Sequence, residues 1–216
     1  MNKKWKAIIF DMDGTLFDTE QIAIDSWYAY SEKYGIPVCE EFMYQLFGRT
    51  KESAKEIFQK YMPKDWDVDE AYRFRDKYKH DYKVEHGPLP KTNLNKLFET
   101  LKEKEYKIAL CSSSSKEAIE FNLSFDNLQH HFDVIVNGKM VAKGKPAPDI
   151  YKLTAKKLNI KPEECLVVED SKSGILAGHR ANMDVIMVVD KIQPDDELKN
   201  ICFKIFDHLD EILTVL

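Results

Sequence analysis

The sequence has few features that would tie the protein to a membrane or to the cell exterior. Its 216 residues contain only four cysteines, and no two of them form a C-x-x-C pair, so we expect neither disulfides nor a structural zinc site. No apolar run is long enough to cross a bilayer. The N-terminus also lacks the apolar region and the cleavage site of a signal peptide. We therefore expect a cytoplasmic protein with free thiols and no membrane partner.

A strong charge of either sign is also missing. The net charge is −5, and acidic and basic residues are interspersed along the chain. Such a balance gives no general attraction to nucleic acid, so any phosphate group that the protein binds has to be held by local contacts. The length is sufficient for one generous domain or for a domain with a smaller insert. We expect no nucleic-acid partner and a monomeric chain.

Two sequence patterns divide the chain. Residues 18–83 have an almost purely helical periodicity, whereas short apolar strands alternate with helices after residue 90. Alternation of this kind is typical of a parallel sheet that is covered by helices on both faces. The predicted fold class is therefore α/β, with a core of residues 1–17 and 88–216 that is split by a helical insert of residues 18–87. The hinges are expected near residues 18–19 and 84–90.

Individual elements follow from the same periodicity and from the positions of glycine and proline. The predicted strands cover residues 7–10, 107–111, 134–136, 166–168 and 185–189. The predicted helices cover residues 21–34, 50–61, 67–83, 94–104, 116–123, 149–158 and 171–181.

Polar and charged residues follow several of the predicted strands. In an open α/β sheet, ligands bind beyond the carboxyl ends of the strands, so these residues are the first place to look for a site. They are Asp11 and Asp13 in the run DMDGT, Ser112 at the start of four serines, Lys145 in a loop, and Glu169 with Asp170. Each group alone is common in turns, helix caps or exposed loops. Because all of these groups are predicted to lie near strand ends, a catalytic site is favoured over separate roles in turns, caps or loops.

The two aspartates suit phosphoryl transfer. A carboxylate is ionised at neutral pH and needs no base to act as a nucleophile, which makes Asp11, the first residue after the strand, the candidate nucleophile. Expulsion of an alkoxide requires a proton, and the same group can later remove a proton from water. Asp13 is the candidate for this general acid and base.

The remaining residues supply charge compensation. Neighbouring carboxylates favour a hard divalent cation with oxygen ligands, and we expect Mg²⁺. Asp11, Glu169 and Asp170 are the predicted ligands, together with Asp13 through its backbone carbonyl. Ser112 and Lys145 are expected to hold the oxygens of the transferring phosphoryl group.

These motifs, in this order, resemble those of the haloacid dehalogenase superfamily over nearly the whole chain. The resemblance implies a Rossmann-like core with an inserted helical cap, Mg²⁺ dependence and an aspartyl-phosphate intermediate. The subgroup that the chain is most similar to is the β-phosphoglucomutase-like one, which also contains many sugar-phosphate phosphatases. Asp13 disfavours the dehalogenases proper, which lack this second aspartate.

Within that subgroup, the resemblance leaves phosphatase and mutase as alternatives. Thr19 and Arg49 match residues of the mutases, in which the arginine holds the second phosphate of the substrate. Ala23 stands where the mutases carry a histidine, and this favours hydrolysis. Arg49 could also simply pair with Glu52 on its own helix. We expect a phosphatase of a small phosphorylated metabolite. The alternatives are a β-phosphoglucomutase and a non-catalytic sugar-phosphate sensor.

Overall fold

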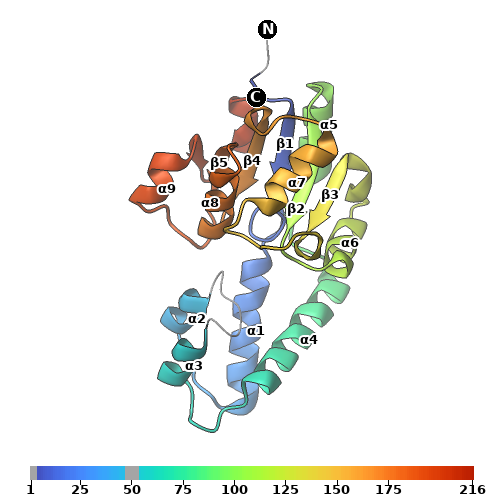
Figure 1. The fold of residues 1–216 in the computed structure, drawn as a ribbon. Coiled ribbons are helices and arrows are strands. Elements are labelled where there is room, and N and C mark those ends of the chain that lie inside the picture. Colours follow the sequence, from blue (N-terminus) through green and yellow to red (C-terminus); the bar gives the residue numbers. More distant parts are fainter. Residues whose placement is uncertain (1–3, 47–53) are drawn as a thin grey trace. The chain divides into compact units, whose positions relative to one another are not determined.

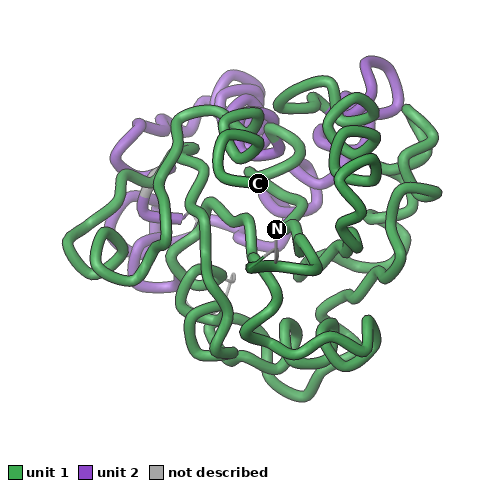
Figure 2. The backbone as a smooth tube through the Cα atoms, turned by 90° about the horizontal axis from the view of Figure 1, so that it is seen from above, with its two compact units in different colours: residues 1–18, 89–216 green, residues 19–88 purple. Residues whose placement is uncertain are grey.

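The protein divides into two compact units (Figure 2). The computed structural model describes residues 4–46 and 54–216. Unit 1 consists of Met1–Asp18 and Leu89–Leu216, and unit 2 consists of Thr19–Pro88. Each observed boundary lies one residue after the predicted one. Unit 2 is therefore an insertion in the chain of unit 1, and it begins shortly after the first strand.

A parallel sheet forms the centre of unit 1 (Figure 1). The strand order is β3-β2-β1-β4-β5-β6, and every neighbouring pair is parallel. The strands are β1 (Ala7–Phe10), β2 (Lys107–Ser112), β3 (Val134–Asn137), β4 (Cys165–Glu169), β5 (Asp184–Val188) and β6 (Lys204–Phe206). The first five confirm the predicted parallel α/β core. The sequence analysis missed β6, because three residues are too few to show a periodicity.

Helices cover both faces of this sheet. The α-helices of unit 1 are α5 (Leu94–Glu103), α6 (Lys116–Ser124), α7 (Asp149–Leu158), α8 (Lys172–Arg180) and α9 (Asp196–Ile201). The 3-10 helices are η1 (Leu128–His131), η2 (Gly138–Met140), η3 (Pro162–Glu164) and η4 (Leu209–Thr214).

Successive side chains of each strand point to opposite faces of the sheet, and this divides the core of unit 1 into two layers. In β1, Ile8 and Phe10 pack with α5, α6 and η4, whereas Ala7 and Ile9 pack with α7, α8 and α9. Both sets are fully buried, as expected for a central strand that is covered on both sides. The result is a rigid platform with all carboxyl strand ends at one edge.

Unit 2 is helical throughout its described part. Its helices are α1 (Thr19–Tyr34), α2 (Glu40–Leu46), α3 (Lys55–Tyr61) and α4 (Val68–His86). Aromatic side chains fill its core, and the guanidinium carbon of Arg75 lies 3.9 Å from the ring centroid of Trp27. The helix α4 continues through residues 84–86, which were expected to belong to the hinge. Gly87, with a φ of 76°, ends it.

The two chain segments that connect unit 1 with unit 2 are hydrogen-bonded to each other within unit 1. The amide of Asp18 donates to the carbonyl of Leu89 at 2.7 Å, and the amide of Lys91 donates to the carbonyl of Leu16 at 2.9 Å. A single bridge between Phe17 and Pro90 lies between these bonds. The outgoing and returning segments are therefore tied together where they leave the sheet.

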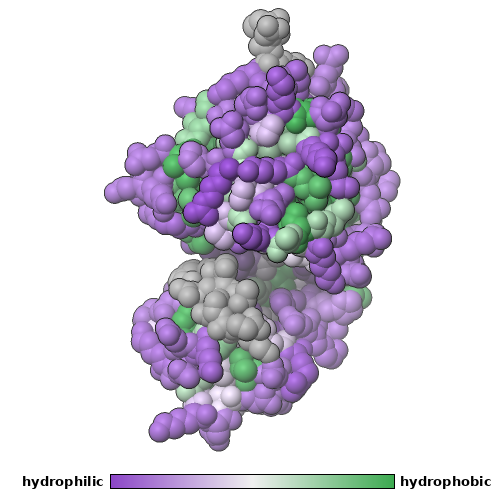
Figure 3. Space-filling model, viewed as in Figure 1, coloured by the Kyte–Doolittle hydropathy of each residue, from purple (hydrophilic) through white to green (hydrophobic). Residues whose placement is uncertain are grey.

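The surface of each unit is mainly polar. Hydrophilic residues cover most of the face drawn in Figure 3, and the hydrophobic ones occur in small groups. Among the helices of residues 4–46 and 54–216, none combines the length and the apolar character that a membrane span requires.

Candidate active site

The first strand delivers Asp11 to the carboxyl edge of the sheet. β1 ends at Phe10, and the amide of Asp11 still donates to the carbonyl of Val168 in β4 at 3.0 Å. The chain then turns at Gly14, whose φ of 84° lies in the left-handed region that favours glycine. The amide of Gly14 donates to the carbonyl of Phe17 and closes this turn at 2.8 Å. The run DMDGT therefore folds back at the sheet edge instead of continuing the strand.

Lys145 joins two carboxylates at this edge. Its Nζ lies 2.5 Å from Oδ1 of Asp11 and 2.7 Å from Oε1 of Glu169. The three side chains are 6%, 10% and 1% exposed, in the order Lys145, Asp11 and Glu169. Ion pairs that are this well shielded from water are screened little by salt. An ammonium group is thus fixed beside the candidate nucleophile.

Donors surround both oxygens of Glu169. Oε2 accepts hydrogen bonds from the amides of Asp170 and Ser171 and from the hydroxyl of Ser171, at 2.7–2.9 Å. Oε1 accepts from Lys145 and, at 3.3 Å, from the hydroxyl of Tyr151. A Cβ at Gly174 would overlap this carboxylate, so the first turn of α8 needs glycine there. Glu169 is consequently a fixed acceptor that connects β4, α8 and Lys145.

Asp170 points toward the turn that follows β1. Its Oδ1 accepts a hydrogen bond from the hydroxyl of Thr15 at 2.9 Å, and its side chain lies so close to Gly14 that a Cβ at that position would overlap it. Asp170 is 7% exposed and Thr15 is fully buried. Gly14 therefore serves twice, since it makes the turn and leaves room for Asp170.

Two serines at the end of β2 and in the loop after it donate hydrogen bonds to Asp13. The hydroxyl of Ser114 donates to Oδ2 of Asp13 at 2.7 Å, and that of Ser112 donates to the same oxygen at 3.3 Å. Ser112 also accepts the amide of Ser114 at 3.0 Å. Because β2 pairs directly with β1, the serines and Asp13 meet although about 100 residues separate them.

The site carries an excess of negative charge. Burial raises the pKa of Asp11 to about 8; Lys145 opposes this rise, and the carboxylates of Glu169 and Asp13 add to it. Burial, followed by repulsion from Glu169 and Asp11, raises the pKa of Asp170 well above its usual range. Burial alone would lower the pKa of Lys145, but the carboxylates of Asp11 and Glu169 outweigh it and raise this pKa. A further cation would relieve the repulsion.

The donor set fits a hard divalent cation. Residues 4–46 and 54–216 contain no trio of His, Cys, Asp or Glu side chains that is already arranged as a metal-ligand set. Mg²⁺, however, is usually held by one or two carboxylates and completes its shell with waters and phosphate oxygens of the substrate. Asp11 and Asp170 offer such carboxylates at the sheet edge, and Asp13 offers a backbone carbonyl.

The structure brings together the core residues that the sequence analysis selected, and leaves the two substrate predictions open. Asp11, Asp13, Ser112, Lys145, Glu169 and Asp170 all lie at the carboxyl ends or loops of unit 1. Thr19 is the first residue of α1 in unit 2, and Arg49 lies outside the described residues.

The sequence analysis missed three residues that contact this site. Thr15 bonds Asp170, Tyr151 bonds Glu169, and Ser114 bonds Asp13. Thr15 and Ser114 both belong to motifs that had attracted attention, but the pattern gives no indication of their partners. Tyr151 lies in an ordinary amphipathic helix, and nothing in its neighbourhood in the sequence marks it.

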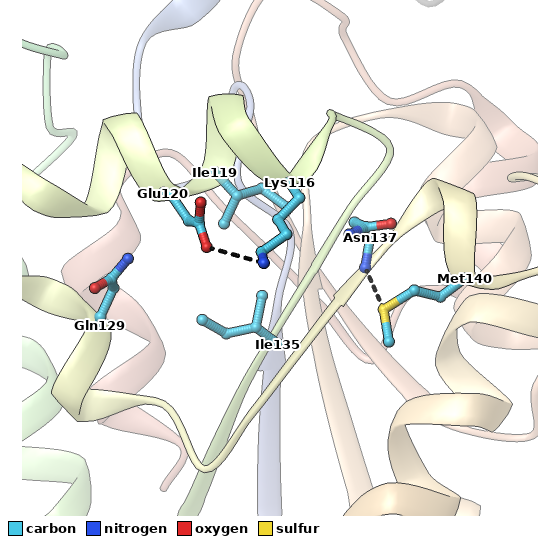
Figure 4. A pocket seen from close by; sticks show the side chains of 7 residues that line it. All are labelled: Lys116, Ile119, Glu120, Gln129, Ile135, Asn137 and Met140. Carbon is cyan, nitrogen blue, oxygen red and sulfur yellow. Dashed lines mark hydrogen bonds and ion pairs between the residues drawn. The ribbon is translucent and has the colours of Figure 1, made fainter.

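A separate cavity of about 430 Å³ lies beside the edge strand β3 (Figure 4). Ile119 and Ile135 form its apolar wall, and Lys116 makes an ion pair of 3.6 Å with Glu120 across its side. Its lining contains none of the candidate site residues, which are Asp11, Asp13, Ser112, Lys145, Glu169 and Asp170. Its size suits a small ligand, but the chemistry of the carboxylates, the lysine and the serines lies elsewhere.

Comparison with known proteins relates this arrangement to a single family. The family model described as haloacid dehalogenase-like hydrolase matches residues 8–188. A protein of Thermotoga maritima named phosphorylated carbohydrates phosphatase is 34% identical over 184 residues, which are 84% of this chain and 83% of the relative. The beta-phosphoglucomutase of Bacillus subtilis is 30% identical over 192 residues, or 85% of this chain and 83% of the relative.

The solved structures agree with this relationship. A crystal structure of a Thermotoga maritima protein, provisionally described as a beta-phosphoglucomutase, is similar with a TM-score of 0.80 and 30% sequence identity. The similarity covers 97% of both chains.

Proposed function

This chain belongs to the haloacid dehalogenase-like hydrolase family, and from that premise we propose that it is a Mg²⁺-dependent phosphatase of a small phosphorylated metabolite, in particular a sugar phosphate. The observation that carries the proposal is the buried contact of Lys145 with Asp11, next to an Asp13 that two serines hold. A nucleophile, a positive charge and a proton-transfer group thus meet at one sheet edge. The name of the Thermotoga relative supports the substrate class.

In the proposed reaction, the residues of unit 1 act in two steps. A carboxylate oxygen of Asp11 attacks phosphorus, the ester P–O bond breaks, and Asp13 gives its proton to the departing oxygen. A water molecule then attacks phosphorus of the aspartyl phosphate while Asp13 takes one of its protons. The P–O bond to Asp11 breaks, and free Asp11 carboxylate and inorganic phosphate result. Lys145 and Ser112 donate to the phosphoryl oxygens and stabilise their developing charge.

Asp11, Asp170 and the backbone carbonyl of Asp13 would hold the Mg²⁺ ion. When bound, the ion would neutralise the clustered carboxylates and polarise the phosphoryl group. Glu169 is not part of this proposed ligand set, although the sequence analysis included it, because donors occupy both of its oxygens. Its proposed role is to orient Lys145. Unit 2 would be the cap that selects the substrate.

Phosphate release from a panel of sugar phosphates tests this function. With Mg²⁺ present we expect turnover of at least one sugar phosphate, loss of turnover with EDTA, and no turnover by the Asp11→Asn variant. Trapping with beryllium fluoride should place the analogue on Asp11. Release that is the same in the Asp11→Asn variant and in the parent would contradict the proposal.

A β-phosphoglucomutase is the second candidate, and the Bacillus subtilis relative together with Thr19 and Arg49 favours it. A mutase would form glucose 6-phosphate from β-glucose 1-phosphate, with a bisphosphate activator, faster than inorganic phosphate appears. A phosphatase would release phosphate at least as fast as any isomer forms. Both products can be followed in the same reaction mixture, so one experiment separates the two functions.

A further inference from the structure

The four consecutive serines that begin with the last residue of β2 lie in four different environments. Ser112 is fully buried, Ser113 is exposed and Ser114 is half-buried. Ser115 caps the N-terminus of α6, where its hydroxyl accepts the amide of Ala118 at 3.3 Å. The four serines therefore have different roles, although they are the same residue type. Neither helix capping nor packing explains the role of Ser114.

Ser114 makes the better of the two hydrogen bonds to Asp13. Its O–H···O distance of 2.7 Å lies at the usual value for a hydroxyl donor, whereas the 3.3 Å from Ser112 lies beyond the normal range. A bond from a hydroxyl to a carboxylate is also stronger than a bond between neutral groups. Ser114 is thus the main side-chain donor that fixes the orientation of Asp13.

The proposed reaction increases the difference between Ser114 and Ser112 as donors to Asp13. A hydroxyl has a single proton to donate, and in the proposed mechanism Ser112 donates its proton to a phosphoryl oxygen. Ser112 then no longer holds Asp13. Ser114 remains, because its hydroxyl has no other role in that mechanism. It engages Oδ2 of Asp13 and leaves Oδ1 to carry the proton that is transferred.

We propose that Ser114 is a positioning residue, which holds Oδ2 of Asp13 so that Oδ1 can deliver a proton to the leaving group. This inference rests on the proposed phosphatase function and deepens it. The proton donor has to stay within hydrogen-bond reach of the leaving oxygen, and Asp13 stands on a turn at the rim of the sheet, where its side chain is only half-buried. The loop after the neighbouring strand β2 supplies, through Ser114, the hydrogen bond that fixes this side chain.

Two esters that differ mainly in their leaving groups test this role. Phenyl phosphate needs a proton for expulsion of its poorly stabilised anion, whereas p-nitrophenyl phosphate releases a stable anion. The ratio kcat/KM reports the steps up to ester cleavage only. For Ser114→Ala we expect kcat/KM to fall about 10-fold to 100-fold for phenyl phosphate, which is part of the usual effect of a general acid. For p-nitrophenyl phosphate we expect little change.

The serine run itself provides matched controls. Ser113→Ala removes an exposed hydroxyl one residue away and should leave kcat/KM unchanged for both esters. Ser114→Thr keeps a hydroxyl and should restore most of the turnover of phenyl phosphate. An equal loss for both esters, or no loss for either, would overturn the positioning role.

Crystal structures of the parent and of Ser114→Ala provide an independent measurement. We expect the carboxylate of Asp13 to leave its position in the variant and to keep it in Ser113→Ala. An unmoved carboxylate in Ser114→Ala would refute the inference. If the parent cleaves neither ester, the sugar-phosphate panel still decides the phosphatase proposal, and this structural comparison decides the role of Ser114 by itself.

Discussion

The ammonium of Lys145 lies 2.5 Å from Oδ1 of Asp11, in a site where both side chains are at least nine-tenths buried. The same ammonium contacts Glu169 at 2.7 Å. One cation therefore compensates two carboxylates and still leaves Asp13 and Asp170 to be balanced. The proposed Mg²⁺ ion would compensate the remaining negative charge, while Lys145 would face the phosphoryl group.

Replacement of Lys145 should remove transition-state stabilisation. We expect Lys145→Met to lower kcat for the best sugar phosphate by about 100-fold to 1000-fold, the usual effect of losing one charged donor to the reacting oxygens. Steady-state phosphate release measures this. Lys143→Met is the matched control, because Lys143 is an exposed lysine of the same loop. Comparable kcat values in the two variants would show that Lys145 is not part of the catalytic machinery.

The effect of Mg²⁺ on stability should depend on pH. The folded-state pKa of Asp11, about 8, lies above its ordinary value of 3.8, so the folded protein binds this proton more tightly than the unfolded chain. In the metal-free protein, the resulting stabilisation is complete below the unfolded pKa and is lost as the pH rises through about 8. A cation that compensates ionised Asp11 should then stabilise the protein more at high pH.

Thermal unfolding with EDTA and with Mg²⁺ measures this dependence. We expect the rise in Tm on addition of Mg²⁺ to be larger at about pH 9 than at about pH 6, and to depend less on pH in the Asp11→Asn variant. A rise in Tm that is independent of pH in the parent would contradict the assignment of Asp11 as a metal ligand.

Gly174 should be irreplaceable for steric reasons. A Cβ at this position would overlap the carboxylate of Glu169, so Gly174→Ala has to displace the group that orients Lys145. We expect a loss of about 1–3 kcal/mol in the free energy of unfolding, as is typical of overpacked sites, together with reduced turnover. Urea denaturation measures the first effect.

Gly144→Ala is the control for this substitution, because a Cβ built at Gly144 has no atom within 4 Å beyond Gly144 itself and its two neighbours in the chain, among the described residues. Its unfolding free energy should stay within about 0.5 kcal/mol of the parent value. Equal stabilities of the two alanine variants would mean that α8 shifts freely to accommodate a side chain at Gly174.

The ion pair of Lys91 with Asp190 should fix the segment that returns from unit 2 to the loop after β5. Nζ of Lys91 lies 2.5 Å from Oδ1 of Asp190, whose side chain is 5% exposed. Among the described residues, Oδ2 of Asp190 has no hydrogen-bond partner. Lys91→Met would remove the ammonium at 2.5 Å from this buried carboxylate and leave Lys191, whose Nζ lies 4.0 Å from Oδ1. We expect a loss of about 3 kcal/mol in unfolding free energy.

The double variant Lys91→Met, Asp190→Asn tests the cause of this loss. The double variant also removes the negative charge of Asp190, which has lost its ion pair in the single variant. Most of the free energy of unfolding should therefore return. Chemical denaturation of the parent, the single variant and the double variant provides the comparison. If the double variant is as unstable as the single one, the aliphatic stem of Lys91 and its packing are responsible instead.

Local chemistry was enough to select most of the candidate site. An apolar strand that ends in DMDGT is recognisable without any neighbour, because burial, a turn-forming glycine and two carboxylates occur within nine residues. Ser112 and Glu169 were identified for the same reason, since each directly follows an apolar strand. The hydrogen-bond partners of these residues could not be identified in this way. Ser114, Thr15 and Tyr151 make their contacts across 18 to 155 residues of sequence.

The sequence by itself determined the parallel α/β core, the helical insert and the residue types at the strand ends, because periodicity, turn residues and charge act over short distances along the chain. Only the tertiary structure decided which of these groups meet. The strand order places β1 between β2 and β4, so that Asp13 reaches Ser114 while Asp11 reaches Lys145. It also decided that Glu169 is surrounded by donors, since the amides that surround it depend on how α8 begins. Asp11 and Asp13 could be identified within one segment of sequence, whereas their different environments depend on the segments that pack beside them.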